Sequence, residues 1–472
     1  MATSIAPGGD TGPLCSARMF VAFLILSIIF FESELLSIAG LAGFRLSGTH
    51  NLLKSVDHGR GTVTPLHDGP APLFDGAQLY EYESRADTLA RLAATPAALL
   101  APLTLEAQRL LYEWQHPAEC VGRRFLVSRG NEETAGLGSH GHISTHHVAL
   151  AFEMGLIFLW HPDAGIMYTD EGTCADGTIN FECFFDAPSN CTLDDARDPA
   201  SSITEVRNGD AGLHVPGAYQ FYHVPRVFTE MWERAHLPVV FGETTRQSDA
   251  LKYWFRGQVA AYLARFNRAT LGSMRELRQN KSLLLHAIGP HASPGAAAAL
   301  EAGTLFPLTP GTISVHIRHG DKHLEMSLVP TAAYFEEATV LARRHPMALG
   351  GHRMFLSTED PEAVGEVSKA VLTAGIDGRR GAWIVSWWDV PRENSNGKSQ
   401  LANFNLPRGK LTIIWWLQLF IALEADAWVG TRGSNWNRLI DELRCVWVPK
   451  CQNIFAEVGD EARWEHLSWR RA

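Results

Sequence analysis

The chain has 472 residues, of which 46% are hydrophobic and 19% are charged, with a formal net charge of −10. This length exceeds one ordinary core, because single cores stop growing at roughly 250 to 300 residues, and it predicts two domains plus a leader. The hydrophobic content excludes a mainly disordered protein. The acidic balance excludes a general nucleic-acid binder, which needs a net basic surface to displace counterions from phosphates.

The first unusual segment is apolar. Residues 19–31 are broken only by Ser27, and a second apolar stretch follows Glu32 and Glu34 and continues to residue 44. Three interpretations stay open: a signal anchor over residues 19–44, a cleaved signal peptide, and a buried helix. We expect the anchor, with residues 1–18 as a cytoplasmic tail and the rest of the chain in the secretory lumen.

Cysteine usage is consistent with an oxidising compartment. After Cys15, six cysteines remain, an even number: Cys120, Cys174, Cys183, Cys191, Cys445 and Cys451. They allow three disulfides. No CxxC pair and no histidines at ligand spacing accompany them, so we expect no structural metal.

Hydrophobic periodicity predicts two βαβ patterns along the chain. The first has a strand at 124–128, a glycine-rich turn at 135–142, a helix to about 155 and an apolar strand at 156–160. The second has strands at 312–317, 353–357, 383–386 and 427–430, with helices at 331–344, from 361, at 411–423 and at 435–443. Between them, residues 168–215 are rich in Cys, Asp, Gly and Pro and predict an irregular excursion stapled by disulfides.

These patterns favour an α/β fold of two Rossmann-like lobes that face a cleft. We expect a helical stem over residues 45–115, a first lobe over 116–290 and a second lobe over 291–472.

The segment from His316 to Lys322 concentrates ionisable side chains where a buried strand ends, which is where ligands collect in open α/β sheets. Arg318 offers a planar fork for two phosphate oxygens and Lys322 adds a point charge, so together they could neutralise a diphosphate leaving group. Asp321 and Glu325 are the carboxylates that could orient the lysine or take a proton from an attacking hydroxyl. A plain salt-bridge cluster is the alternative.

A second alternative comes from Arg318-His319-Gly320, the signature of phosphatases in which the histidine becomes phosphorylated. Lys322 stands where those enzymes usually have arginine or threonine. The segment also lies two-thirds along the chain rather than near the start of a domain. Both features count against a phosphatase.

Three further segments could hold a ligand. In residues 429–436 a strand enters a helix through small residues, and the helix start could bind phosphate through free N–H groups and the Ser434 hydroxyl, although Ser434 could equally be a simple N-cap. The glycine loop over 136–141 allows the same two interpretations. Asp360 could face the cleft, but such a residue more often starts the next helix. Trp415 and Trp416 have apolar neighbours, which favours a place in the core.

Taken together, three segments resemble the alpha-1,6-fucosyltransferases, including the core N-glycan enzyme and the nodulation fucosyltransferases. They are residues 316–322, similar to the family's HVRRTDK or HVRHG motif, the turn 358–361, and Ala425-Asp-Ala-Trp-Val-Gly-Thr-Arg-Gly-Ser-Asn435, with weaker similarity at 138–151 and 253–255. The similarity spans roughly residues 120–445.

The resemblance implies a GT-B type fold with an acceptor-side first lobe, a second lobe that binds GDP-fucose, and inverting transfer that needs no metal or cofactor. Arg318 would grip the β-phosphate beside Ser434, and His316 would contact the nucleoside. Glu325, assisted by Lys322, would be the base. Catalytic residues would then be Glu325, Lys322, Asp321 and Arg318, and donor-binding residues His316, Arg318, His319, Asp360, Ser434, Asn435 and Gly138.

The same resemblance implies disulfides between Cys174 and Cys183 and between Cys120 and Cys191, a single-pass type II protein of the Golgi membrane, and an acceptor that is a glycan or glycoprotein, with fucose joined alpha-1,6 to core GlcNAc. A homodimer and a catalytically silent homologue are left open. Three positions depart from the family: His319 replaces an arginine, Glu325 lies one residue closer to the lysine, and Gln418 stands in place of an aspartate.

Overall fold

The computed structural model describes residues 75–129, 136–163, 166–174, 177–206, 224–235, 249–280, 283–294, 298, 306–324, 326–373, 382–395, 397–451 and 454–459. All of these residues belong to one compact unit. The predicted anchor over 19–44 lies outside the described residues. Within the described ranges, no helix combines the length and the apolar character that a membrane crossing requires.

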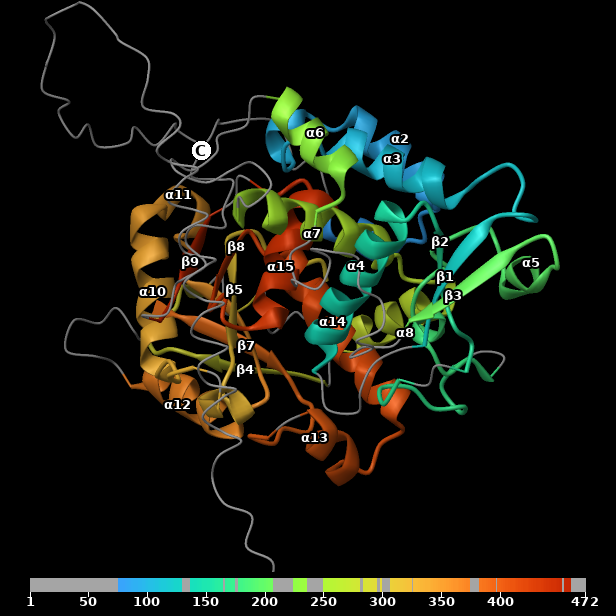
Figure 1. The fold of residues 1–472 in the computed structure, drawn as a ribbon. Coiled ribbons are helices and arrows are strands. Elements are labelled where there is room, and N and C mark those ends of the chain that lie inside the picture. The colour runs from blue at the N-terminus through green and yellow to red at the C-terminus, as the bar shows by residue number, and fades with distance from the viewer. Residues whose placement is uncertain are drawn as a thin grey trace, which may run out of the picture. The chain divides into compact units, whose positions relative to one another are not determined.

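Two sheets organise the described part of the chain (Figure 1). The first has three parallel strands in the order β2-β1-β3: β1 (Arg124–Ser128), β2 (Ile157–Trp160) and β3 (Ser202–Val206). The second has six strands in the order β4-β7-β6-β5-β8-β9: β4 (Leu284–Ile288), β5 (Thr312–Ile317), β6 (Arg353–Thr358), β7 (Ile384–Trp388), β8 (Ala427–Gly430) and β9 (Phe455–Glu457). Only β4 among these strands runs antiparallel to its neighbour. The predicted α/β class with parallel sheets is confirmed.

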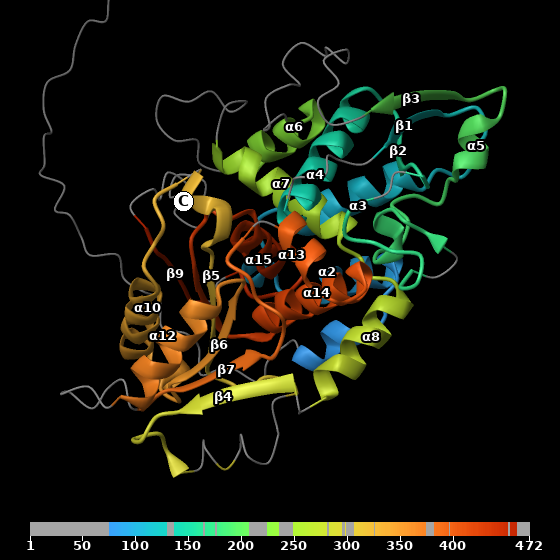
Figure 2. The same cartoon turned by 90° about the horizontal axis from the view of Figure 1, so that it is seen from below.

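The helices of this part of the chain are α2 (Arg85–Ala94), α3 (Thr104–Gln115), α4 (Leu137–Glu153), α5 (Leu193–Arg197), α6 (Arg226–Arg234), α7 (Asp249–Leu263), α8 (Arg268–Gln279), α10 (Thr331–Arg344), α11 (Pro346–Leu349), α12 (Pro361–Leu372), α13 (Gly397–Asn403), α14 (Arg408–Glu424) and α15 (Asn435–Val446). Helices α10 and α12 cover one face of the second sheet and α14 covers the other (Figure 2). Helix α4 packs on the first sheet, and α7 contacts both α4 and α15.

The predicted elements at 124–128, 312–317 and 331–344 coincide with β1, β5 and α10. Three strands were not expected. Strand β3 lies inside the stretch predicted to be irregular and pairs in parallel with β1. Strand β4 lies at the end of the predicted first lobe but joins the second sheet, and β9 lies beyond the last predicted helix and pairs with β8. The expectation of an irregular excursion over 168–215 is therefore wrong for residues 202–206. The predicted boundaries at 115/116 and 290/291 stay predictions.

The strand order places a topological switch beside β5. Strands β6 and β7, the next two along the chain, extend the sheet on one side of β5, whereas β8 and β9 extend it on the other. In open α/β sheets, the crevice outside the carboxyl ends of the strands at such a switch is the usual ligand site. The carboxyl end of β5 is where the charged segment from His316 onward begins.

One hydrophobic cluster continues from the first sheet into the second. It includes Leu126 of β1, Phe158 of β2, Phe355 of β6 and Trp428 of β8, all at most 1% exposed. Helix α14 is buried on nearly all sides and supplies much of this cluster, which explains its almost continuous apolar sequence. The two sheets are thus joined through a shared core.

Disulfides connect Cys120 with Cys191, Cys174 with Cys183, and Cys445 with Cys451. The two pairings that the family resemblance implied are confirmed. Thr169 Oγ1, next to Tyr168, donates to the Ile179 carbonyl at 2.7 Å, inside the loop that the Cys174–Cys183 bond closes. On the other side, Thr412 Oγ1 of α14 donates to the Tyr168 carbonyl at 2.8 Å.

A buried ion pair ties the N-terminal part of the unit to α14. Glu424 accepts hydrogen bonds from Arg278 Nη2 at 3.0 Å, Tyr80 Oη at 2.5 Å and the Leu308 N–H at 2.8 Å. Both charged side chains are 1% exposed. Each partner therefore depends on the other for compensation of its charge.

We expect Arg278→Met to lower the free energy of unfolding by about 3 to 5 kcal/mol, because it leaves a carboxylate buried without a counter-ion. Urea denaturation followed by tryptophan fluorescence measures this. Arg226→Ala is the matched control, since it breaks an ion pair with Glu230 whose side chains are 75% and 51% exposed, and should leave the free energy of unfolding nearly unchanged. Equal losses in the two variants would contradict this account.

Candidate active site

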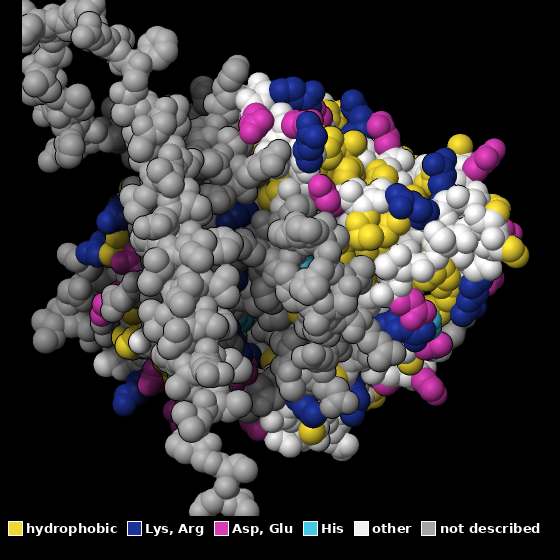
Figure 3. Space-filling model, viewed as in Figure 1, with side chains coloured by type: hydrophobic (Ala, Val, Ile, Leu, Met, Phe, Trp, Pro, Cys, Tyr) yellow, Lys and Arg dark blue, Asp and Glu magenta, His cyan; other side chains and the backbone are white. Residues whose placement is uncertain are grey.

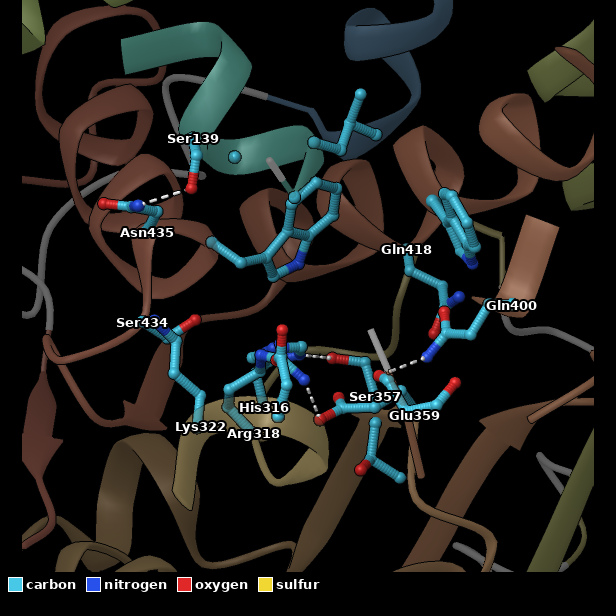
Figure 4. Close-up of a pocket in the computed structure, with 18 of the residues that line it drawn as sticks. Ser139, His316, Arg318, Lys322, Ser357, Glu359, Gln400, Gln418, Ser434 and Asn435 are labelled. Carbon is cyan, nitrogen blue, oxygen red and sulfur yellow. Dashed lines mark hydrogen bonds and ion pairs between the residues drawn. The ribbon is translucent and has the colours of Figure 1, made fainter. Parts of the chain in front are cut away.

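A cavity of about 240 Å³ opens where β5, β6, α4, α14 and α15 meet (Figure 4). Seven of the predicted site residues line it: Gly138, His316, Arg318, Asp321, Lys322, Ser434 and Asn435. The cavity therefore combines residues from the start of α4 with residues some 180 to 300 positions later in the chain.

Arg318 follows the last residue of β5 and lies between two carboxylates. Its Nη1 donates to Glu359 and its Nη2 to Asp321. Burial opposes the charge, but Glu359 and then Asp321 outweigh it and raise the pKa of Arg318 above its ordinary value. Arg318 thus carries a permanent charge in a fixed orientation at the carboxyl edge of the sheet.

Among the described residues that line the cavity, Lys322 is the other cationic side chain. It belongs to a short 3-10 helix, Gly320–Leu324, whose turn is closed by the Lys322 N–H donating to the His319 carbonyl at 3.1 Å. The residue is 7% exposed, so its ammonium is held close to the cavity rather than extended into solvent.

His316 lies at the floor of the cavity as a neutral ring. Its Nδ1 shares a hydrogen bond with Ser357 Oγ at 2.9 Å, and its buried Nε2 has no hydrogen-bond partner among the described residues. Burial and then the charge of Arg318 lower the pKa of His316 to about 3. A neutral ring with an unsatisfied nitrogen can bind a neutral polar group of a ligand, and an unpaired buried nitrogen costs free energy until it does so.

The N-termini of two helices lie at this cavity. Gly136 and Ser434 are the N-cap residues of α4 and α15, and at neither position does a side chain cap the helix. The first residues of both helices line the cavity. Free N–H groups and the positive end of the helix dipole make each terminus a site for an anion, and here two of them serve one cavity.

Gly138 lets the two termini approach each other. A Cβ at this position would lie 2.9 Å from the Trp436 nitrogen and 3.0 Å from the Asn435 carbonyl carbon, both of them backbone atoms. Across the same contact, Asn435 Nδ2 donates to Ser139 Oγ at 2.7 Å, as Figure 4 shows. The glycine of the predicted loop is therefore required for contact between helices.

Two of the predicted donor-binding residues lie elsewhere. His319 and Asp360 are absent from the cavity wall and contact each other, with His319 Nδ1 2.6 Å from Asp360 Oδ2 and Nε2 2.9 Å from the Val329 carbonyl. Asp360 also caps α12 through the Glu362 N–H at 2.9 Å. Of its two sequence interpretations, the helix start is the one that the structure contains.

Glu325, the predicted base, lies outside the described residues. Among the described residues that line the cavity, the carboxylates are Asp321 and Glu359. Glu359 was not predicted, although it adjoins Asp360 in the turn 358–361. Its Oε1 also accepts from the His319 N–H at 2.7 Å, which fixes this side chain to the turn that follows β5.

The neutral wall of the cavity consists of Tyr168, Gln400, Trp415 and Gln418, together with Val390 and Pro391. The sequence pointed to Gln418 only as a departure from the family, and it did not point to Tyr168, Gln400, Val390 or Pro391. Trp415, predicted to be in the core, is half-buried on this wall and forms an edge contact with Tyr168, whereas Trp416 is buried as expected. The aromatic composition of residues 415 and 416 was visible in the sequence, but which ring faces the cavity depends on the rotation of α14.

On the face shown in Figure 3, the Lys and Arg side chains of the described residues are interspersed with Asp and Glu side chains, so no patch of one sign stands out there. Within the described residues, no group of three or more His, Cys, Asp or Glu side chains could hold a metal ion.

Comparison with known proteins gives a distant structural likeness. No protein-family model matches the sequence, and no curated protein matches it. Three solved structures of POFUT1 are similar to the chain: the apo form, at 10% identity and a TM-score of 0.30, covers 73% of this chain and 99% of its own. The complex with GDP-fucose has 11% sequence identity and a TM-score of 0.32, and the match covers 73% of this chain and 100% of the POFUT1 chain. The complex with GDP has 12% identity and a TM-score of 0.32, and the match covers 72% of this chain and 98% of the POFUT1 chain. Scores this low leave the function to be argued from the cavity.

We expect Gly138→Ala to weaken the binding of a nucleoside diphosphate at least about tenfold, because the new methyl group would push α4 away from the backbone of α15 and separate the two N-termini. Isothermal titration calorimetry with GDP measures this. Gly141→Ala is the matched control, since its added Cβ meets no heavy atom within 4 Å and alanine is the better helix former. An affinity within about twofold of the parent in Gly138→Ala would contradict the role of the contact.

Proposed function

We propose that this chain is a glycosyltransferase that transfers fucose from GDP-fucose to a hydroxyl of a glycan. The observation that carries the proposal is the convergence of Arg318, Lys322 and the uncapped N-termini of α4 and α15 on one cavity at the switch point of the second sheet. Such a set of positive groups is suited to a diphosphate, which carries charge on both phosphates.

The proposed reaction breaks the bond between the anomeric carbon of fucose and the β-phosphate oxygen. The electron pair of that bond leaves with the phosphate, so negative charge develops on the diphosphate as the bond lengthens. Arg318 and the two helix ends would stabilise this charge, since they are already oriented and need no reorganisation during the reaction. Ser434, 2% exposed at the start of α15, would add its hydroxyl to the phosphate contacts.

The acceptor hydroxyl supplies the new bond to the anomeric carbon, and its proton needs a base. We propose Glu325 for this role, with Lys322 to orient it, on the resemblance of residues 316–325 to the fucosyltransferase motif. Asp321 and Glu359 each already accept a hydrogen bond from Arg318, which leaves them less available to take the proton of the acceptor hydroxyl. An inverting, metal-independent course and an alpha-1,6 bond to core GlcNAc belong to the same proposal.

The choice of fucose as the transferred sugar and the location in the Golgi membrane rest on the motif resemblance, not on the geometry of the cavity. A diphosphate cradle would accept other sugar nucleotides as well. The segments at 316–322, 358–361 and 425–435 are what favour GDP-fucose. We propose in the same way that the chain is a type II protein of the Golgi membrane, held by residues 19–44, with the option of a homodimer.

The phosphatase alternative requires a histidine nitrogen that faces the phosphate. Both nitrogens of His319 face oxygen acceptors, the Asp360 carboxylate and the Val329 carbonyl. Burial works against protonation, but Asp360 and Val329 outweigh it and raise the pKa of His319. A ring with a raised pKa and with both nitrogens engaged by acceptors is a poor nucleophile.

A silent homologue that binds the nucleotide without transfer is the remaining alternative. Incubating the full chain with GDP-fucose and a panel of N-glycans and chitin oligomers, and analysing products by mass spectrometry, separates the two. A GDP-dependent rise in melting temperature without any fucosylated product would favour the silent homologue.

We expect Arg318→Ala to reduce fucose transfer at least about a hundredfold, because loss of a preorganised charge contact to the leaving group costs several kcal/mol in the transition state. The measurement is kcat/KM for GDP-fucose at a fixed glycan concentration. Arg197→Ala, which removes a 59% exposed arginine of α5, is the control and should keep parental activity. Activity of Arg318→Ala within about tenfold of the parent would show that the assignment is wrong.

A further inference from the structure

A buried chain of polar side chains lies directly behind the two helix N-termini. His142 of α4 places Nδ1 3.1 Å from Asn435 Oδ1 and Nε2 2.9 Å from Glu442 Oε2, both on α15. Arg256 of α7 donates through Nε to Glu442 Oε1 at 2.7 Å. His142 is 8% exposed and Glu442 is fully buried, and neither lines the cavity. Of these four polar side chains, only Asn435 also lines the cavity.

The hydrogen bonds of Asn435 fix what His142 faces. Asn435 Nδ2 donates to Ser139 Oγ at 2.7 Å, and its Oδ1 accepts from Arg438 Nη1 at 3.0 Å. The side chain is therefore oriented so that its oxygen, an acceptor only, points at His142 Nδ1. Rotating the amide would place its NH₂ against Arg438 and lose both bonds.

Both nitrogens of His142 consequently face acceptors. Although burial raises the pKa of Glu442, Arg256 and then His142 outweigh it, lower that pKa and keep the carboxylate ionised. A neutral imidazole has one N–H and cannot donate to both Asn435 and Glu442, whereas an imidazolium donates to both. The complete set of hydrogen bonds across the α4–α15 junction thus requires the protonated ring.

The surroundings of the ring do not favour that proton while the cavity is empty. Burial lowers the pKa of His142, Arg256 and Arg438 lower it as well, and Glu442 raises it. Among the described residues, the charged side chains that face the ring are Arg256 on α7 and Arg438 and Glu442 on α15. Near neutral pH the empty protein therefore holds most of its His142 rings neutral, with one junction bond unmade.

Occupation of the cavity by a diphosphate changes this balance. Two negative charges placed at the N-termini of α4 and α15 would favour a positive charge just behind them. The proton would complete the bond to Asn435 and hold the two termini together against the ligand.

We infer that His142 is a positioning residue that takes up a proton when a sugar nucleotide binds, and that this proton locks the junction between α4 and α15 around the diphosphate. The inference rests on the proposed function, because it needs a diphosphate in this cavity. Binding should be tightest at pH values below the pKa of His142 in the empty protein. It should weaken as the pH rises through the higher pKa of the ligand-bound state, by at most about tenfold per pH unit.

The test is calorimetric titration of the full chain with GDP-fucose in PIPES, imidazole and Tris at one pH near 7. The three buffers differ in ionisation enthalpy, so the slope of the observed enthalpy against that enthalpy gives the number of protons taken up. GDP-fucose is preferable to GDP, whose terminal phosphate titrates near neutral pH, as phosphomonoesters do. We expect uptake of up to one proton, and a Kd that rises between pH 6 and pH 8.

His142→Gln should abolish the uptake and flatten the pH profile. His161→Gln, which removes another buried histidine that does not line the cavity, is the matched control and should leave the uptake unchanged. Should His142→Gln fail to fold, the proton uptake measured with the wild-type protein and the NMR signal of its His142 ring test the inference without the variant. In ¹⁵N-labelled wild-type protein, we expect the imidazole nitrogen signals of His142 to change from those of a neutral ring to those of a charged ring when GDP-fucose is added.

The outcomes separate the two proposals. Binding of GDP-fucose without proton uptake, or uptake that persists in His142→Gln, would overturn the role of His142 and leave the donor assignment intact. Absence of GDP-fucose binding at every pH between 6 and 8 would instead overturn the proposed function.

Discussion

The close backbone contact between the first turns of α4 and α15 is the constraint on which the rest of the site depends. It is possible only because residue 138 has no side chain. It brings together two like ends of helix dipoles, which repel each other in the absence of an anion. The surrounding structure holds them there, since α7 packs against both helices and Glu442, wholly buried on α15, accepts from both α4 and α7. The cavity is thus built with an excess of positive partial charge that a ligand relieves.

The formal charges of the cavity wall work differently from the helix ends. Arg318 and Lys322 are balanced in number by Asp321 and Glu359 among the described residues that line it. A diphosphate that reaches Arg318 has to replace contacts with two carboxylates, so the gain in binding free energy is less than a bare arginine would give. The same carboxylates hold the guanidinium in place before the ligand arrives, which favours geometric precision over affinity.

Features formed by residues close together in the sequence could be predicted, whereas features that depend on contacts between distant residues could not. Strands β1 and β5, helix α10 and the charged segment after β5 were predicted because their signals lie within a few residues of one another. Strand β3 was not, because its sequence, exposed along most of its length, lacks the apolar alternation that marks a half-buried strand. The direction in which His319 points, away from the cavity, depends on Asp360 and Val329 and could not follow from its position in the motif.

Distant contacts explain the remaining differences. Gly138 was noticed as part of a glycine-rich turn, but its function depends on residues almost 300 positions later, which no local pattern encodes. Tyr168 reaches the cavity because its segment is bonded on both sides. Thr169 Oγ1 donates to the Ile179 carbonyl at 2.7 Å inside the loop that the Cys174–Cys183 disulfide closes, and Asp170 Oδ2 accepts from the Gly409 N–H at 2.6 Å at the start of α14. The sequence showed the cysteines and the aspartate, but their partners across the fold are decided by packing.

Three buried ionic networks connect the segments that make up the cavity: Tyr80, Arg278 and Glu424; His142, Arg256 and Glu442; and Tyr253, Arg432, Asp441 and Glu457. Buried ion pairs contribute little net stability, because desolvation offsets most of their attraction, and apolar side chains of the same volume would often serve as well. Apolar contacts, however, tolerate sliding, whereas hydrogen-bonded charges allow one arrangement of the atoms. Each network joins α14 or α15 to an element that precedes the second sheet in the chain. Neither half of the chain contains the complete cavity, since α4 supplies one helix end and β5, β6 and α15 supply the rest. Fixed placement of those elements is what the site requires, and the three networks sit where sliding would separate its two halves.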